Sequence, residues 1–80
     1  MWEIEFSREA NNYALDSHPY NEDVLIAIES LATSKDGLPS EGYYQLLEQW
    51  CIWEIAEHTV VYEREPHTLY IWIIKPRRLT

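Results

Sequence analysis

The sequence predicts a small α+β domain in which a helical hairpin packs on an antiparallel sheet, in the order β-α-α-β-β-β. Residues 2–6 alternate apolar and charged side chains, which predicts a strand with one buried face. Helical spacing dominates residues 8–33, and β-branched and aromatic residues dominate residues 50–74. Strands joined by short turns usually pair as antiparallel neighbours, so this order predicts a meander covered by two helices.

The first half of the chain carries clear helix signals. Ser7 is a plausible N-cap for a helix over residues 8–16, and residues 17–20 form a turn around a proline. Asn21 can cap a second helix that ends near Thr33. Its apolar face is formed by Val24, Leu25, Ile28, Leu31 and Ala32.

The second half changes from helical to strand periodicity after a loop rich in Gly and Pro at residues 35–42. Residues 44–48 are ambiguous between a short strand and an extended lead-in. The other segments are strands at 50–55, 58–63 and 68–74, with turns at 56–57 and 65–67. Alternate residues Leu69, Ile71 and Ile73 are expected to face the second helix.

Length and composition predict a single domain over residues 1–80. At this size a core is thin unless its side chains are large, and four Trp and six Tyr supply that bulk. One cysteine, Cys51, excludes an internal disulfide framework. With neither a signal peptide nor an apolar run long enough to span a membrane, we expect a soluble cytoplasmic protein.

Charge is unevenly distributed along the chain. Residues 1–74 hold 14 acids and three cations, a net of 3 − 14 = −11, and the tail returns +3 through Lys75, Arg77 and Arg78. An acidic chain is a poor partner for a nucleic-acid backbone, so no direct DNA binding is expected. The acidity serves either solubility alone or a partner with a basic face.

Candidate chemical groups are few. The three histidines (His18, His58 and His67) lack metal-site spacing, and one cysteine cannot complete a zinc cluster, so we expect no metal and no cofactor. His58 is a candidate catalytic group, but its place at the start of a hairpin favours a structural or surface role. Cys51 reads as a buried, inert thiol.

Three other groups have a functional and a structural interpretation. Glu54 and Glu57 could serve acid–base chemistry or form a solvated edge. The tryptophans Trp50, Trp53 and Trp72 could stack bases, but core packing is favoured without basic residues between them. Lys75, Arg77 and Arg78 could bind an anion or form a solvated end.

Three segments together follow a known pattern: an opening strand and helix start at residues 2–10, a central hairpin at residues 52–63, and a final strand with a basic end at residues 69–78. In these segments the chain resembles the RelE/ParE superfamily of toxins, which belong to bacterial type II toxin–antitoxin systems. The resemblance implies a RelE/ParE-like fold and a cognate antitoxin as partner.

The hairpin departs from the pattern of members that cleave messenger RNA on the ribosome. Those members use Arg and Lys on the sheet, whereas this chain has Glu54, Ala56 and Thr59 at the corresponding positions. Metal-independent RNA cleavage needs cationic groups around the phosphate. The leading hypothesis is therefore a divergent, acidic, toxin-like module that acts mainly by protein binding, with weak or absent catalysis.

Two alternatives remain open. The first is an active toxin, either a ribosome-dependent, metal-independent endoribonuclease or, as in the ParE branch, a gyrase inhibitor. The second is an unrelated acidic protein-interaction domain. Under the leading hypothesis the partner is an antitoxin-like protein with a basic face, which wraps the domain and pairs with a sheet edge.

Overall fold

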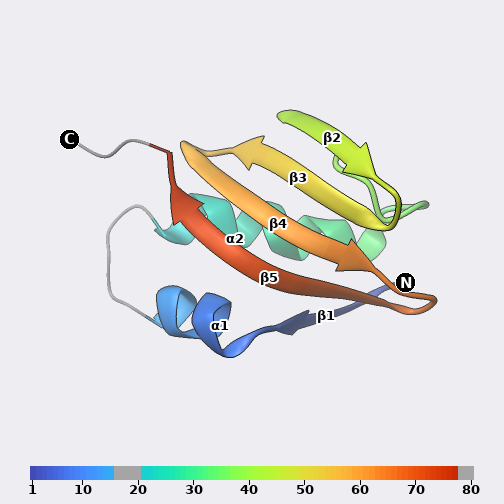
Figure 1. The fold of residues 1–80 in the computed structure, drawn as a ribbon, viewed down its shortest axis with the longest axis horizontal. Coiled ribbons are helices and arrows are strands. Elements are labelled where there is room, and N and C mark those ends of the chain that lie inside the picture. The colour runs from blue at the N-terminus through green and yellow to red at the C-terminus, as the bar shows by residue number, and fades with distance from the viewer. Residues whose placement is uncertain (16–20, 78–80) are drawn as a thin grey trace.

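The computed structural model describes residues 1–15 and 21–77 as five strands, two α-helices and one 3₁₀ helix (Figure 1). The turn expected at 17–20 and the basic residue Arg78 lie outside the described residues. In chain order the elements are β1 (Glu3–Phe6), α1 (Arg8–Leu15), α2 (Asn21–Ser30), the 3₁₀ helix η1 (Leu31–Thr33), β2 (Tyr43–Leu47), β3 (Trp50–Ile55), β4 (His58–Arg64) and β5 (Thr68–Pro76).

The five strands form one mixed sheet in the order β1-β5-β4-β3-β2. The strands from β2 to β5 make the expected antiparallel meander, but β1 lies parallel to β5. The prediction of a wholly antiparallel sheet was therefore wrong at one edge. The reason is that two helices separate β1 from the meander, so no short turn dictates its direction.

The ambiguous segment before residue 50 is a true strand, β2, paired with β3 over its whole length. Gly42 allows the chain just before β2 to lie close to the backbone of β3. Its φ is +79°, and a Cβ there would lie 2.5 Å from the Glu54 carbonyl oxygen. Only glycine fits a position that is both left-handed and in contact with a neighbouring backbone.

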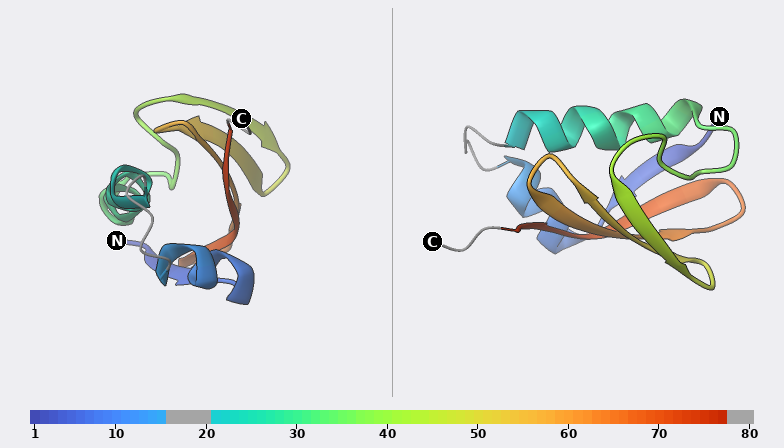
Figure 2. Two further views of the ribbon diagram at one scale, coloured as in Figure 1. Left: turned by 90° about the vertical axis from the view of Figure 1, so that its left-hand side faces the viewer. Right: turned by 90° about the horizontal axis from the view of Figure 1, so that it is seen from above.

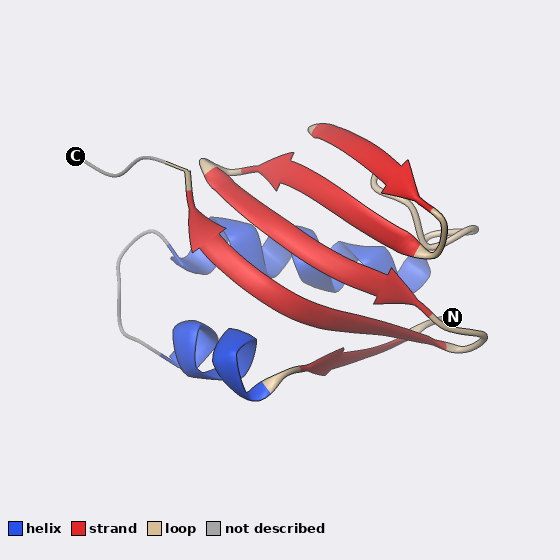
Figure 3. Ribbon diagram, in the orientation of Figure 1, coloured by secondary structure: helices blue, strands red, loops and turns tan. Residues whose placement is uncertain are grey.

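Both helices lie on one side of the sheet and leave its other side uncovered (Figures 2 and 3). The core between the layers is formed by Ala10, Val24, Ile28, Leu31, Cys51, Trp53, Val60, Tyr62, Leu69, Ile71 and Ile74. The predicted apolar face of the second helix is confirmed, since Val24 and Ile28 are fully buried. Leu25 packs against this core at its margin.

A bulge changes which residues of β5 face the helices. Tyr62 pairs with Ile71 while Val61 pairs with Ile73, so Trp72 is the extra residue on β5. The extra residue reverses the alternation, and the core position expected for Ile73 is taken by Ile74. Ser7 supports the bulge, because its hydroxyl donates to the Trp72 carbonyl at 2.7 Å.

The helix starts are held by side-chain hydrogen bonds. Ser7 caps α1 as predicted, with its Oγ accepting from the Ala10 amide at 3.1 Å. Asn21 is the first residue of α2 rather than the residue before it. Its amide Nδ2 donates to the Tyr13 carbonyl at 2.7 Å and so joins the two helices.

Candidate functional site

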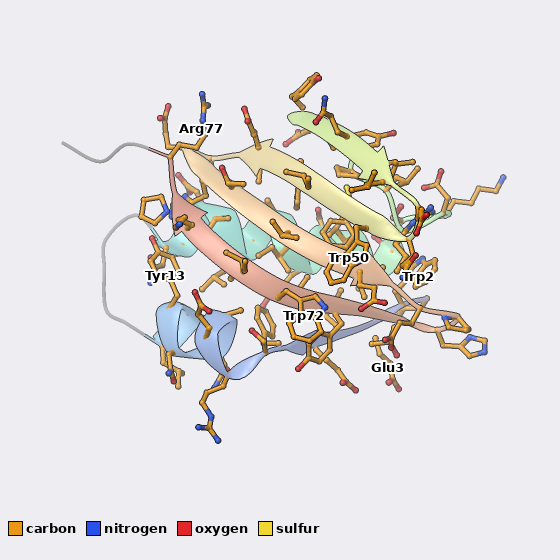
Figure 4. All side chains as sticks on the ribbon, viewed as in Figure 1. Trp2, Glu3, Tyr13, Trp50, Trp72 and Arg77 are labelled. Carbon is orange, nitrogen blue, oxygen red and sulfur yellow. The ribbon has the colours of Figure 1, made fainter. Side chains whose placement is uncertain are left out.

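The uncovered side of the sheet carries a cluster of apolar side chains that we term the aromatic face. Cross-strand pairing brings its members from β3, β4 and β5 onto one side of the sheet: Trp50, Ile52, Val61, Tyr70, Trp72 and Ile73. The Trp72 ring centroid lies 4.7 Å from that of Tyr70 and 5.9 Å from that of Trp50. Trp72 remains 40% exposed, and Figure 4 shows it beside Trp50 on the near side of the sheet.

A carboxylate lies within this cluster and orients it. Glu63 pairs with Trp50 on one side and with Tyr70 on the other. Its two oxygens accept hydrogen bonds from the Trp72 Nε1 at 3.2 Å and the Gln49 Nε2 at 3.3 Å. These bonds place the negative charge between Trp50 and Tyr70, next to the indole of Trp72.

The aromatic face is bordered by acids along its β1 side and by cations at one end. Glu3 and Glu5 are exposed on β1, next to β5. At the end of β5, Lys75 is exposed. It pairs across the sheet with Thr59, and Thr59 pairs in turn with Glu54. Glu54 therefore stands in the same row as the lysine.

A nearby carboxylate neutralises part of the positive charge of the predicted basic cluster, Lys75, Arg77 and Arg78. The Arg77 Nε lies 3.8 Å from a Glu54 oxygen in an exposed ion pair, and Figure 4 shows Arg77 at the turn end of the sheet. The Arg77 amide also donates to the Glu57 carbonyl at 2.8 Å. Glu54 thus offsets the charge that Lys75 and Arg77 would present to a phosphate.

His58 is buried, and both ring nitrogens are engaged in the protein. Its Nδ1 lies 2.7 Å from the Ala56 carbonyl, which can only accept, so Nδ1 carries the hydrogen. Its Nε2 lies 2.7 Å from the Tyr13 hydroxyl. The residue that we considered as a catalytic candidate therefore joins α1 to the β3–β4 turn as a structural group.

Cys51 lies in the core, as its strand position predicts. Burial raises the pKa of the thiol, an effect reduced by a side-chain hydrogen bond with Tyr62 and by Arg64. Burial also raises the pKa of Tyr62 far above its ordinary range, and its hydroxyl donates to the Gly37 carbonyl at 2.8 Å. A protonated and enclosed thiol is not a nucleophile.

A groove of about 380 Å³ lies between α2 and β3. Ile26, Ala27 and Ile55 form much of its wall, and Asp23 and Glu41 are its charged lining residues. Acidic lining disfavours an anionic ligand. Within residues 1–15 and 21–77, no group of three His, Cys, Asp or Glu side chains is placed to hold a metal ion. Likewise, no helix in that part of the chain is long and apolar enough to cross a membrane.

Sequence reasoning missed the aromatic face because it treated the three tryptophans as one set. Trp53 is in the core, where it donates to the Glu41 carbonyl at 2.8 Å. Trp50 and Trp72 lie on the opposite side of the sheet. The alternation along β3 separates Trp50 from Trp53, but the bulge that places Trp72 is not visible in the sequence.

Comparisons of the chain with protein-family models, with curated proteins and with solved structures found no match. The functional interpretation therefore rests on the fold and on the chemistry of its surfaces.

Proposed function

We propose that this chain is a protein-binding module with a RelE/ParE-like fold, a toxin-like member of a type II toxin–antitoxin system in the cytoplasm. Its partner is an antitoxin-like protein with a basic face. The element order supports the proposal, since two helices follow the first strand and precede the antiparallel meander. The observation that carries the binding function is the aromatic face.

The aromatic face has the composition of a protein interface. Trp and Tyr are enriched in the centres of such interfaces, and contiguous apolar patches on an uncovered sheet mark interaction sites. Trp72 is partly exposed, and Glu63 accepts its indole hydrogen. Tryptophan is among the residues that most often dominate binding energy at interfaces.

Charge indicates the chemistry of the partner. The chain has a formal net charge of −8, and Glu63 places a carboxylate inside the cluster. A segment that combines apolar anchors with Lys or Arg would match both features. Such a partner would associate faster at low salt than at high salt.

Catalysis is the weaker alternative. Of the basic residues at the end of the last strand, Arg77 is paired with Glu54, and Lys75 lies in the same cross-strand row as that carboxylate. A cleaved phosphate needs positive charge where Glu54 adds negative charge. Purified protein should therefore not cut messenger RNA in a translating extract. If the wild-type chain does cut messenger RNA and the Lys75→Ala and Arg77→Ala variants do not, the result would instead support the endoribonuclease alternative.

The binding proposal is tested by titrating the chain with the protein encoded by the neighbouring reading frame, at two salt concentrations. Trp72→Ala should weaken binding by about 30-fold, as loss of a central aromatic anchor does. Leu15→Ala is the matched control, because Leu15 is exposed at the end of α1 and should leave affinity unchanged. Growth arrest on expression of the chain alone would favour an active toxin.

The proposal fails if the neighbouring protein does not bind, or if Trp72→Ala and Leu15→Ala bind it equally. Tight binding to duplex DNA without any protein partner would also contradict it.

A further inference from the structure

The two edges of the sheet are protected to very different degrees. β1 forms one edge, has four residues, and exposes Glu3 and Glu5. Short edge strands with charged side chains resist pairing with another chain. The β1 edge therefore shows the features of an edge that stays unpaired.

β2 forms the other edge and has none of this protection. Its five residues, Tyr-Tyr-Gln-Leu-Leu, include no charge and no proline. Tyr43 is 61% exposed, Leu47 is 64% exposed, and Leu46 is also exposed. Figure 1 shows β2 at the rim of the sheet, with β3 as its one neighbouring strand. An apolar, uncharged edge of this kind is a template for strand pairing.

We propose that β2 pairs antiparallel with β2 of a second copy of this chain, about a two-fold axis through Gln45. In this register Tyr43 lies opposite Leu47, Tyr44 lies opposite Leu46, and Gln45 lies opposite its own copy. The pairing joins the two sheets into one continuous sheet and covers the exposed apolar side chains of both edges.

The order of residues along β2 explains why the occupant is a second copy. Two aromatic residues precede the central glutamine and two aliphatic residues follow it, so reversing the strand matches each aromatic with an aliphatic residue. Directly opposed side chains contact one another across an antiparallel pair, so each tyrosine would pack on a leucine. A one-residue slip would move every side chain to the other face, so this register is favoured over its neighbours.

The acids that flank β2 do not oppose this register. Glu41 lies opposite Gln49 of the other copy, and Glu48 lies opposite Gly42, so no carboxylate directly faces another. The net charge of −8 on each chain does oppose association at long range. Salt screens this repulsion. Dimerisation should therefore strengthen as salt rises, whereas binding of a basic partner should weaken.

The test is a measurement of mass in solution by light scattering or sedimentation on the chain alone. The wild-type chain should have twice its monomer mass of 9.6 kDa. Two charge variants, Tyr43→Lys/Leu47→Lys and Tyr43→Glu/Leu47→Glu, should each be monomeric because like charges face one another. Mixed in equal amounts they should recover the dimer mass, because every Lys then faces a Glu.

Ile26→Lys is the matched control, since Ile26 is 58% exposed on α2 and should leave the dimer intact. Gln45→Cys adds a milder test that does not depend on the charge variants folding. A short bis-maleimide should cross-link it rapidly to a second copy, while Ile26→Cys should not cross-link. The native Cys51 is buried and does not compete.

A wild-type chain that stays at 9.6 kDa at high concentration and high salt overturns the proposal. The proposal is also overturned if the two charge variants are each folded but do not form a dimer when mixed. Equal cross-linking of Gln45→Cys and Ile26→Cys would overturn it as well. Pairing of β2 with a heterologous protein in place of a second copy would also overturn it. Trp72→Ala should leave the dimer intact, so this result is separate from the test of the aromatic face.

Discussion

At the scale of single residues, several polar groups inside the protein act as structural connections. His58 joins Ala56 and Tyr13, and the Trp2 indole donates to the Ser34 carbonyl at 3.0 Å. The bonds to Tyr13 and Ser34 each tie a segment to another that is distant in the sequence. A buried polar group that loses its partner costs more free energy than the bond itself contributes.

Tyr13→Phe should lower the free energy of unfolding by about 1–3 kcal/mol, because it leaves the buried His58 Nε2 without its hydroxyl partner. Urea denaturation measures the change. Tyr43→Phe is the matched control, since Tyr43 is exposed and its substitution should change stability by less than about 0.5 kcal/mol. Equal effects of the two changes would contradict this role of Tyr13.

Alkaline pH should destabilise the protein through Cys51 and Tyr62. Their ordinary pKa values are 9.0 and 10.0, and burial raises both in the folded state. Well below pH 9.0 both states keep these protons, so there the groups add no pH dependence. Above it the unfolded chain loses protons that the folded protein retains, so stability falls as pH rises.

Urea denaturation at successive pH values above 9.0 measures this slope. In Cys51→Val the decline should begin nearer pH 10.0, where Tyr62 alone contributes. A free energy of unfolding that is constant through this range would show that neither group is held protonated by folding.

At the scale of elements, both helices hold the two layers together: α1 packs directly on β5, and α2 supplies buried residues to the same core. The fully buried residues Val24 and Ile28 of α2 lie in one core cluster with Leu69 and Ile71 of β5. The bulge at Trp72 lets β5 place Ile74 in the core while Trp72 lies on the aromatic face. The bulge therefore determines which β5 residues lie in the core and which lie on the aromatic face.

Ile28→Ala should lower the free energy of unfolding by about 2–5 kcal/mol, because it removes buried methyl groups and leaves a cavity. Ile26→Ala in the same helix is the matched control. Ile26 is exposed, so its substitution should have little effect on stability in urea or thermal denaturation. A small effect at Ile28 would mean that α2 does not seal the core as described.

At the scale of the whole molecule, the two sides of the sheet differ in what covers them, and the net charge favours some kinds of partner over others. The helices cover one side of the sheet (Figure 2). The residues of the aromatic face lie on the other side. The chain as a whole has a formal net charge of −8. Long-range electrostatics then favours basic partners and disfavours polyanions.

The isolated chain should show negligible affinity for duplex DNA, because its acids repel phosphate. A fluorescence titration with labelled duplex at low salt, where any electrostatic affinity is largest, measures this. A basic DNA-binding protein of similar size serves as the positive control. Binding that weakens steeply as salt rises would show that a local cationic surface outweighs the net charge.

The sequence by itself determined the α+β class, the turns of the meander and the buried face of the second helix. These features depend on local rules: periodicity, capping at Ser7, and a short turn at 56–57. It also separated an acidic body from a basic tail. Such properties are set by residues close together in the chain, so a pattern of neighbours is enough to predict them.

Only the tertiary structure decided how distant segments meet. It placed β1 parallel to β5, turned residues 43–47 into an edge strand, and inserted the bulge at Trp72. It also buried His58 between Ala56 and Tyr13, which the position of this residue at a hairpin start does not reveal. The physical reason is that pairing direction, bulges and burial depend on contacts between segments many residues apart, which local sequence patterns do not encode.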